Sequence, residues 1–379
     1  WTCARALAAV RRGALRAAPS RFATLDARTP SEPQCDRPHH RAMGGGESDE
    51  VNALAANSES ISTGPLLAVP DFWERESGAP LLRRNAGFIP TQGPADAILE
   101  RVQAWPGLCG AANGDAVASG VCNDEAAFRI FLRDAERTFK HPEHQQRMIN
   151  LLKRVWPENR DYHQGLGYIT SLFMLLFDDD TAVRMLLKIT RDERYTPGYW
   201  LAAPDAYVRD AMVFQRLVQE RYPEVHALLT SACIVPEAYA SKWFIGLCVH
   251  VLPFEALFDY VQAFLEDGHM FLFRFSLALI EATSERLLTF KFTEVNKILE
   301  VLRLDTTQYA DDFEGGAFFT AMVANAKTIA LEPEQIVSLR AEESERLAEK
   351  MRKTREREAA MAAEESDDEI VFSDEEDDE

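Results

Sequence analysis

Two polar residues in separate short motifs carry side chains that could do chemistry together. Arg137 lies near the end of one expected helix, and Gln164 lies where a polar loop gives way to another helix. They are 27 residues apart, so one intervening helix, expected near 144–155, can run out and return. A planar cation beside a neutral amide suits phosphoryl transfer. The cation stabilises charge that develops on the phosphate, and the amide orients the attacking water.

The helix that carries Arg137 is expected over 124–139. At about 100° per residue, its apolar side chains form one stripe and Arg137 lies opposite that stripe, facing solvent. Asp134 lies one turn earlier, where an i,i+3 pair can steer the guanidinium. The alternative is an ordinary surface ion pair with no further role. The stripe consists of Phe128, Phe131, Leu132, Ala135 and Phe139.

The motif around Gln164 reads Asp161-Tyr162-His163-Gln164-Gly165. We expect Tyr162 to pack inward while Gln164 points out at the start of the helix. Gly165 has no Cβ, so another backbone can approach it closely. The alternative is an N-terminal helix turn without any chemical role.

The sequence lacks the signatures of several common functional sites. It has no G-x-x-x-x-G-K-[ST] phosphate loop, no H-E-x-x-H zinc motif and no nucleophile elbow. His141 and His144 flank a helix entrance, where we expect a capping or surface role rather than metal binding. The net charge of −20 argues against a nucleic-acid partner. No apolar run is long enough for a membrane span.

The two motifs together resemble those of a known family. Phe131-x-x-Asp134-x-x-Arg137-Thr138 is similar to the I-x-x-D-x-x-R motif of TBC domains, the Rab GTPase-activating proteins. Tyr162-x-Gln164-Gly165 is similar to their Y-x-Q-G motif. Weaker matches extend the resemblance over roughly 120–285, and the order and spacing of the motifs are more specific than any one of them. These matches include Phe214, Tyr222-Pro223, Tyr239, Trp243-Phe244, Leu252-Pro253, Glu266-Asp267-Gly268 and Phe271-Leu272-Phe273-Arg274.

The resemblance implies a function and a set of site residues. Arg137 would be an arginine finger and Gln164 a glutamine finger, both inserted into the nucleotide site of a GTP-bound Rab-type GTPase. The supporting residues would be Asp134, Thr138, Tyr162 and Gly165. The partner would supply GTP and Mg²⁺, so the chain itself would need no cofactor or metal and would activate an enzyme rather than be one. It would regulate vesicle trafficking from the cytosol or from the surface of endomembranes.

This sequence departs from the family pattern at several positions. Phe131 stands where Ile is usual, Leu166-Gly167 replaces Met-Asn, and Val261-Gln262 replaces a Trp-Asp pair. These changes leave a second hypothesis open: a catalytically weak Rab-binding or scaffold protein of the same fold. Such a protein would act through its helical surface and its charged C-terminus.

The elements that position the two motifs are expected to be helices throughout. The 3.6-residue period dominates from about 96 to 330, so we predict an all-α TBC domain there. Asp178 is expected to cap one helix, and Pro204 and Pro236 to open two others. The helix from Pro236 is expected to continue through Val251. Cys233 and Cys248 are expected to be core thiols, as in a reducing compartment such as the cytosol.

The two ends of the chain differ from its body in composition. The chain begins at Trp1, which suggests a fragment or a processed product. Residues 1–30 carry six Arg and one acid, and we interpret them as a disordered or mis-assigned leader, with a mitochondrial transit peptide as the alternative. Residues 1–95 as a whole are expected to be a disordered leader and linker. Residues 331–363 predict a long solvated charged helix, with a coiled-coil partner helix as the alternative, and residues 364–379 a disordered acidic tail.

Overall fold

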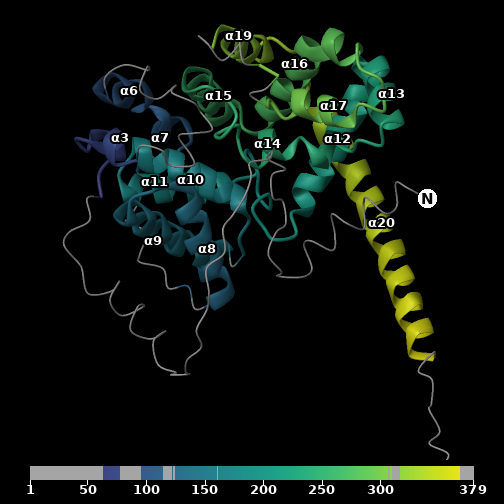
Figure 1. The fold of residues 1–379 in the computed structure, drawn as a ribbon, viewed down its shortest axis with the longest axis horizontal. Helices are drawn as coiled ribbons and strands as arrows, with labels where there is room; N and C mark the ends of the chain where they lie inside the picture. The colour runs from purple at the N-terminus through teal and green to yellow at the C-terminus, as the bar shows by residue number, and fades with distance from the viewer. Residues whose placement is uncertain are drawn as a thin grey trace, which may run out of the picture. The chain divides into compact units, whose positions relative to one another are not determined.

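A computed structural model describes residues 63–76, 95–113, 122, 124–159, 161–305, 308–309 and 316–367. Every regular element in this part of the chain is helical (Figure 1), which confirms the all-α fold class. The expected leader, residues 1–30, and residues 368–379 of the acidic tail lie outside the described residues. The described helices are η1 (Leu66–Ala68), α3 (Phe72–Arg75), α6 (Ala95–Val102), α7 (Trp105–Leu108), α8 (Glu125–Thr138), α9 (Pro142–Asn159), α10 (Gln164–Leu176), α11 (Asp179–Arg191), α12 (Asp205–Arg221), α13 (Pro223–Ser231), η2 (Pro236–Ala238), α14 (Ser241–Phe244), α15 (Phe254–Asp267), α16 (His269–Leu287), α17 (Val295–Leu302), α19 (Ala317–Ala326) and α20 (Pro333–Asp367).

Helices α8 to α11 pack on one another and hold both predicted motifs. Helix α9 packs against α8, α10 and α11. Among the described residues it is the one helix between the two motifs in the chain, as predicted. Helix α10 is buried along nearly its whole length, because its central residues are apolar on every side. The side chain of Asp178 accepts a hydrogen bond from the Thr181 backbone N–H and caps α11, as expected.

Helices α12, α14 and α16 pack around aromatic side chains. Phe214 of α12 meets Trp243 and Phe244 of α14 edge to face, and Phe244 also meets Phe273 of α16. All four rings are fully buried. Helix α12 begins directly after Pro204, as predicted.

The prediction of one helix from Pro236 through Val251 is wrong. The chain there forms η2, then the four-residue α14, then a series of turns. Leu247 and Cys248 have φ angles of 42° and 58°, so the backbone turns in the left-handed region and cannot continue a helix. Cys248 is buried as expected. Cys233 is exposed in a turn with φ 54°, so it is not a core thiol.

Part of the segment expected to be linker is packed against the domain. Leu66, Leu67 and Phe72 are buried, and η1 lies against α6 and α10. These residues bury enough apolar surface to order a short stretch that lacks any sustained periodicity. Linker character therefore does not extend to Pro65–Glu76.

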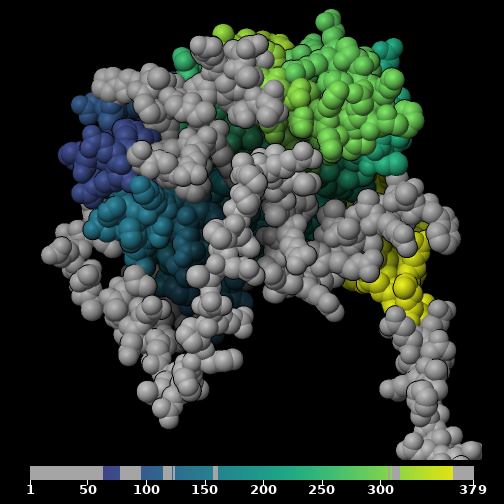
Figure 2. Space-filling model, viewed as in Figure 1, coloured from purple at the N-terminus to yellow at the C-terminus, as the bar shows by residue number. Residues whose placement is uncertain are grey.

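Helix α20 is longer than predicted: it runs to Asp367, so residues 364–367, which were expected in the disordered tail, are helical. One face of its first half is buried rather than solvated. Ile336 and Glu343 are fully buried where α20 lies against α12. Arg340 makes a bidentate pair with the buried Asp210 of α12, with its Nε 2.9 Å from Oδ1 and its Nη2 2.5 Å from Oδ2. Residues 352–361 are mostly exposed, and Figure 2 shows the yellow side chains of α20 on the face in view. None of the described helices is long and apolar enough to cross a bilayer.

Candidate functional site

Helix α8 presents Arg137 to solvent from its last turn. The carboxylate of Asp124 accepts a hydrogen bond from the Ala127 N–H at 3.0 Å and fixes the start of the helix. Phe131 and Ala135 are buried, and the extended conformation of Phe139 ends the helix just after Arg137. The Arg137 side chain is 56% exposed, as the helical periodicity predicted.

Asp134 lies behind Arg137 and is buried, unlike the surface ion pair that was the alternative expectation. Its carboxylate Oδ1 is 3.9 Å from Arg137 Nη1, and its side chain is only 5% exposed. Burial raises the pKa of Asp134 to about 6, although the Tyr162 hydroxyl and Arg137 oppose that shift. The carboxylate is therefore ionised at neutral pH and attracts the guanidinium from inside the domain. Thr138 Oγ1 donates to the Asp134 carbonyl oxygen at 2.6 Å, within the same helix.

Tyr162 connects the two motifs. Its hydroxyl donates to Asp134 Oδ2 at 2.9 Å, and its ring packs edge to face on Phe131. Burial and the neighbouring Asp134 carboxylate raise the pKa of Tyr162, so the hydroxyl keeps its proton and remains a donor. The inward packing expected for Tyr162 is confirmed.

Gly167 makes room for this hydrogen bond, and the sequence argument did not assign it that role. A Cβ at Gly167 would lie 2.8 Å from the Tyr162 hydroxyl oxygen and 3.1 Å from Met148 Cε. Gly167 stands where the family usually has Asn, and the Tyr162 hydroxyl occupies the space that a larger side chain would take there. In the sequence, the only indication of this role was that Gly167 departs from the family pattern.

Gln164 is exposed as the first residue of α10. The backbone before it is held by His163, whose Nδ1 accepts a hydrogen bond from the Gly165 N–H at 3.1 Å. Burial lowers the pKa of His163, which favours the neutral ring that can accept this bond. Asp161 also fixes the loop, because its carboxylate accepts from the backbone N–H of Tyr162 and of Ala202.

Gly165 allows the close backbone approach that was expected. A Cβ there would lie 2.1 Å from Ile245 Cγ2 and 2.9 Å from the Ile245 carbonyl oxygen. That carbonyl accepts a hydrogen bond from Trp200 Nε1 at 3.0 Å, so it is already held in place. Gly165 thus shapes the start of α10 from the Ile245 side, while the hydrogen bond between Tyr162 and Asp134 lies on the α8 side.

The Val261-Gln262 departure leaves the local packing intact. Val261 is buried in α15, and Gln262 Nε2 donates to Glu266 Oε1 at 2.9 Å on the surface. No group of histidine, cysteine, aspartate and glutamate side chains among the described residues is arranged to hold a metal ion.

The arrangement places a cation and an amide on the protein surface from a shared buried support. Arg137 follows Asp134 by three residues, and Gln164 follows Tyr162 by two. The Asp134–Tyr162 hydrogen bond joins the end of α8 to the start of α10. The cation can stabilise negative charge on a group that approaches from outside, and the amide can orient a water molecule.

Comparisons with known proteins find related sequences across the helices that carry these residues. Residues 118–288 match the Rab-GTPase-TBC domain. Carabin from Mus musculus is 28% identical over 197 residues, which cover 48% of this chain and 44% of that protein. The Ecotropic viral integration site 5 ortholog from Drosophila melanogaster is 25% identical over 259 residues, which cover 62% of this chain and 32% of that protein. The chain thus spans less than half the length of these two relatives.

One solved structure is also similar to this chain. The RabGAP TBC domain of the Chlamydomonas flagellum aligns with a TM-score of 0.44 and 14% identity. The alignment covers 75% of this chain and 85% of that structure.

Proposed function

Residues 118–288 belong to the Rab-GTPase-TBC domain family, and from this premise we propose that the chain accelerates GTP hydrolysis by a Rab-type small GTPase. Arg137 and Gln164 act as paired fingers that enter the nucleotide site of the partner in trans. The chain therefore supplies catalytic side chains to a reaction whose GTP and Mg²⁺ the partner holds. It needs no cofactor of its own.

One observation carries this proposal: two exposed polar side chains share a buried support. Asp134 is ionised and nearly solvent-free directly behind Arg137, and Tyr162 connects it to the loop that presents Gln164. A surface ion pair would not need such a support, whereas a finger must hold its direction before the partner arrives.

The chemistry follows from the two side-chain types. The Arg137 guanidinium neutralises charge that develops on the transferred phosphoryl group, and the Gln164 carboxamide orients the attacking water. An arginine finger of this kind is worth about 10³ to 10⁵ in rate, or about 4–7 kcal/mol of barrier. Lysine is a point charge rather than a planar fork, so it replaces the arginine poorly.

The exposed side of α8 provides a docking surface around Arg137. Ile130 is 43% exposed, and Arg133 is exposed one turn before Arg137. Arg133 forms no ion pair or hydrogen bond within the described part of the chain. An apolar side chain with an unpaired cation suits an acidic and partly apolar rim on the GTP-bound partner.

The proposed activity belongs in the cytosol or at endomembrane surfaces, where it would regulate vesicle traffic.

A panel of GTP-loaded Rabs tests the proposal by single-turnover hydrolysis. We expect wild-type protein to stimulate at least one Rab, Arg137→Ala to abolish the stimulation, and Gln164→Ala to lower it about 10²-fold. Arg129→Ala is a matched control, because Arg129 is also an exposed arginine of α8, 76% exposed and only 3.8 Å from Glu125. Lack of stimulation of every Rab, or equal loss with Arg129→Ala, would overturn the proposal.

A further inference from the structure

The segment Pro65–Glu76 lies upstream of the residues that match the family, yet it reaches the connector that directly follows the helix of the arginine finger. Leu66 and Phe72 are each 1% exposed and anchor the segment in the core. Glu76, the last residue of this stretch that the structure describes, is fully buried. A buried carboxylate is costly unless it is well hydrogen-bonded, so its partners indicate what it does.

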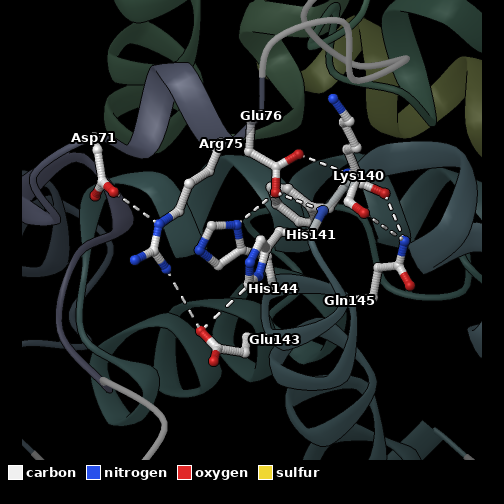
Figure 3. Close-up of polar contacts among 9 residues, drawn as sticks. Asp71, Arg75, Glu76, Lys140, His141, Glu143, His144 and Gln145 are labelled. Atoms are coloured by element: carbon white, nitrogen blue, oxygen red, sulfur yellow. Dashed lines mark hydrogen bonds and ion pairs between the residues drawn. The ribbon is translucent and has the colours of Figure 1, made fainter.

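Glu76 binds the connector between α8 and α9 (Figure 3). Its Oε2 accepts from the Lys140 backbone N–H at 2.6 Å, and its Oε1 from the His141 backbone N–H at 3.0 Å. Nδ1 of the buried His144 lies 2.5 Å from Oε1. An ionised carboxylate only accepts, so Nδ1 carries the proton. The surface role expected as one possibility for His144 is therefore wrong, because its ring is buried beside Glu76 and Phe72.

The three donors keep Glu76 charged. Burial alone would raise the pKa of Glu76, but the hydrogen bonds from His144 and from the Lys140 and His141 N–H groups lower it below its usual range. Hydrogen bonds to an ionised acceptor are about twice as strong as neutral ones. The connector is thus tied to the upstream segment by charge-assisted bonds in a site without solvent.

The other backbone polar groups of the connector are also hydrogen-bonded. The Phe139 N–H donates to the Ala135 carbonyl of α8 at 2.9 Å, and Gln145 Nε2 donates to the Phe139 carbonyl at 2.8 Å. Arg75 adds exposed contacts to Asp71 and Glu143, which contribute little at the surface. These hydrogen bonds therefore fix the backbone of residues 139–141, which begins two residues after Arg137.

We infer that Glu76 is a positioning residue for the arginine finger. By holding the Lys140 and His141 amides, it fixes the end of α8 and so the direction in which Arg137 leaves the helix. The inference rests on the proposed function and extends the functional unit upstream of residues 118–288. Glu76 acts through the backbone, and Arg137 makes the contact with the partner's nucleotide.

The variant Glu76→Gln tests this role with little change in shape. Gln offers one acceptor and one donor, so one of the two backbone N–H groups faces an amide N–H instead of an oxygen. Glu343→Gln is the matched control, because Glu343 is also fully buried and its Oε1 accepts from Arg216 and Arg346. Glu343 lies on α20, which packs on α12 rather than on α8.

Two readouts separate positioning from general stability. Hydrogen exchange of the amides of residues 135–141 should accelerate in Glu76→Gln and stay at the wild-type rate in Glu343→Gln. With a Rab that the wild-type protein stimulates, Glu76→Gln should lower kcat about tenfold with KM within about twofold, because a misdirected finger loses transition-state contacts only. Glu343→Gln should keep kcat even where its Tm falls as far.

The exchange readout does not depend on the proposed function. Unchanged protection of residues 135–141 in Glu76→Gln would overturn the inference, as would a wild-type kcat with a responsive Rab. Absence of any responsive Rab would instead overturn the proposed function and leave the exchange result to decide on Glu76. If Glu76→Gln does not fold, His144→Leu removes one donor and His144→Asn restores an N–H. Local protection should be lost in the first and regained in the second, and equal protection in both would refute the role.

Discussion

Replacing Asp134 by Asn should make the protein more stable and less active. The folded state holds Asp134 at a pKa of about 6, against an ordinary value of 3.8, because the carboxylate is buried. Ionising it at pH 7.5 therefore costs the folded state about 3 kcal/mol relative to the unfolded chain. Asparagine has the same shape and no charge, and its oxygen can still accept from Tyr162.

The sign of this effect sets its pH dependence. Between about pH 4 and pH 6 the folded protein binds a proton that the unfolded chain has released, so the free energy of unfolding falls as pH rises through this window. Asp134→Asn should gain up to about 3 kcal/mol over wild type at pH 7.5 and about half of that at pH 5. Urea unfolding at both pH values measures the difference.

Activity should move in the opposite direction. Without the anion 3.9 Å from its Nη1, Arg137 loses its direction, and the stimulated hydrolysis rate should fall about tenfold to a hundredfold. A variant that is less stable than wild type at both pH values would refute the argument from burial. A more stable variant with full activity would show that Asp134 does not orient the finger.

Three further substitutions probe other parts of the account. Gln164→Ala should leave the free energy of unfolding within about 0.5 kcal/mol, since the side chain is exposed, while stimulated hydrolysis falls about 10²-fold. Gly167→Ala should cost about 1–3 kcal/mol in urea unfolding and weaken stimulation, because the new methyl displaces the Tyr162 hydroxyl; wild-type stability would contradict this. Arg340→Met should cost about 3 kcal/mol, because Asp210 stays buried with only Arg209 and Tyr199 as partners; a loss below 0.5 kcal/mol would contradict it.

The helical period predicted the elements that carry the site. The stripe of α8 placed Phe131 inside and Arg137 outside, and both positions are confirmed. Local chemistry also predicted the inward Tyr162 and the close approach at Gly165, because both follow from residue type at a helix start.

Tertiary contacts account for what the sequence did not predict. Asp134 lies off the apolar stripe of α8, and it is buried beside Gly167 of α10 and the Tyr162 hydroxyl. Glu76 is 64 residues from Lys140 in the chain, and no local pattern connects them. Glu343 interrupts the apolar spacing of α20, yet it is buried because Arg216 of α12 pairs with it. The turns after α14 depend on positive φ at Leu247 and Cys248, which residue type does not indicate.

Binding to a transition-state mimic tests the central claim most directly. A Rab that the wild-type protein stimulates, loaded with GDP and aluminium fluoride, presents a phosphoryl-like group that the two fingers would contact together. We predict that wild-type protein binds this complex at least about 10²-fold tighter than the same Rab with GDP alone, and that Arg137→Ala removes the difference while Arg129→Ala keeps it. Equal affinity of the wild-type protein for both forms, or full preference retained by Arg137→Ala, would contradict the account.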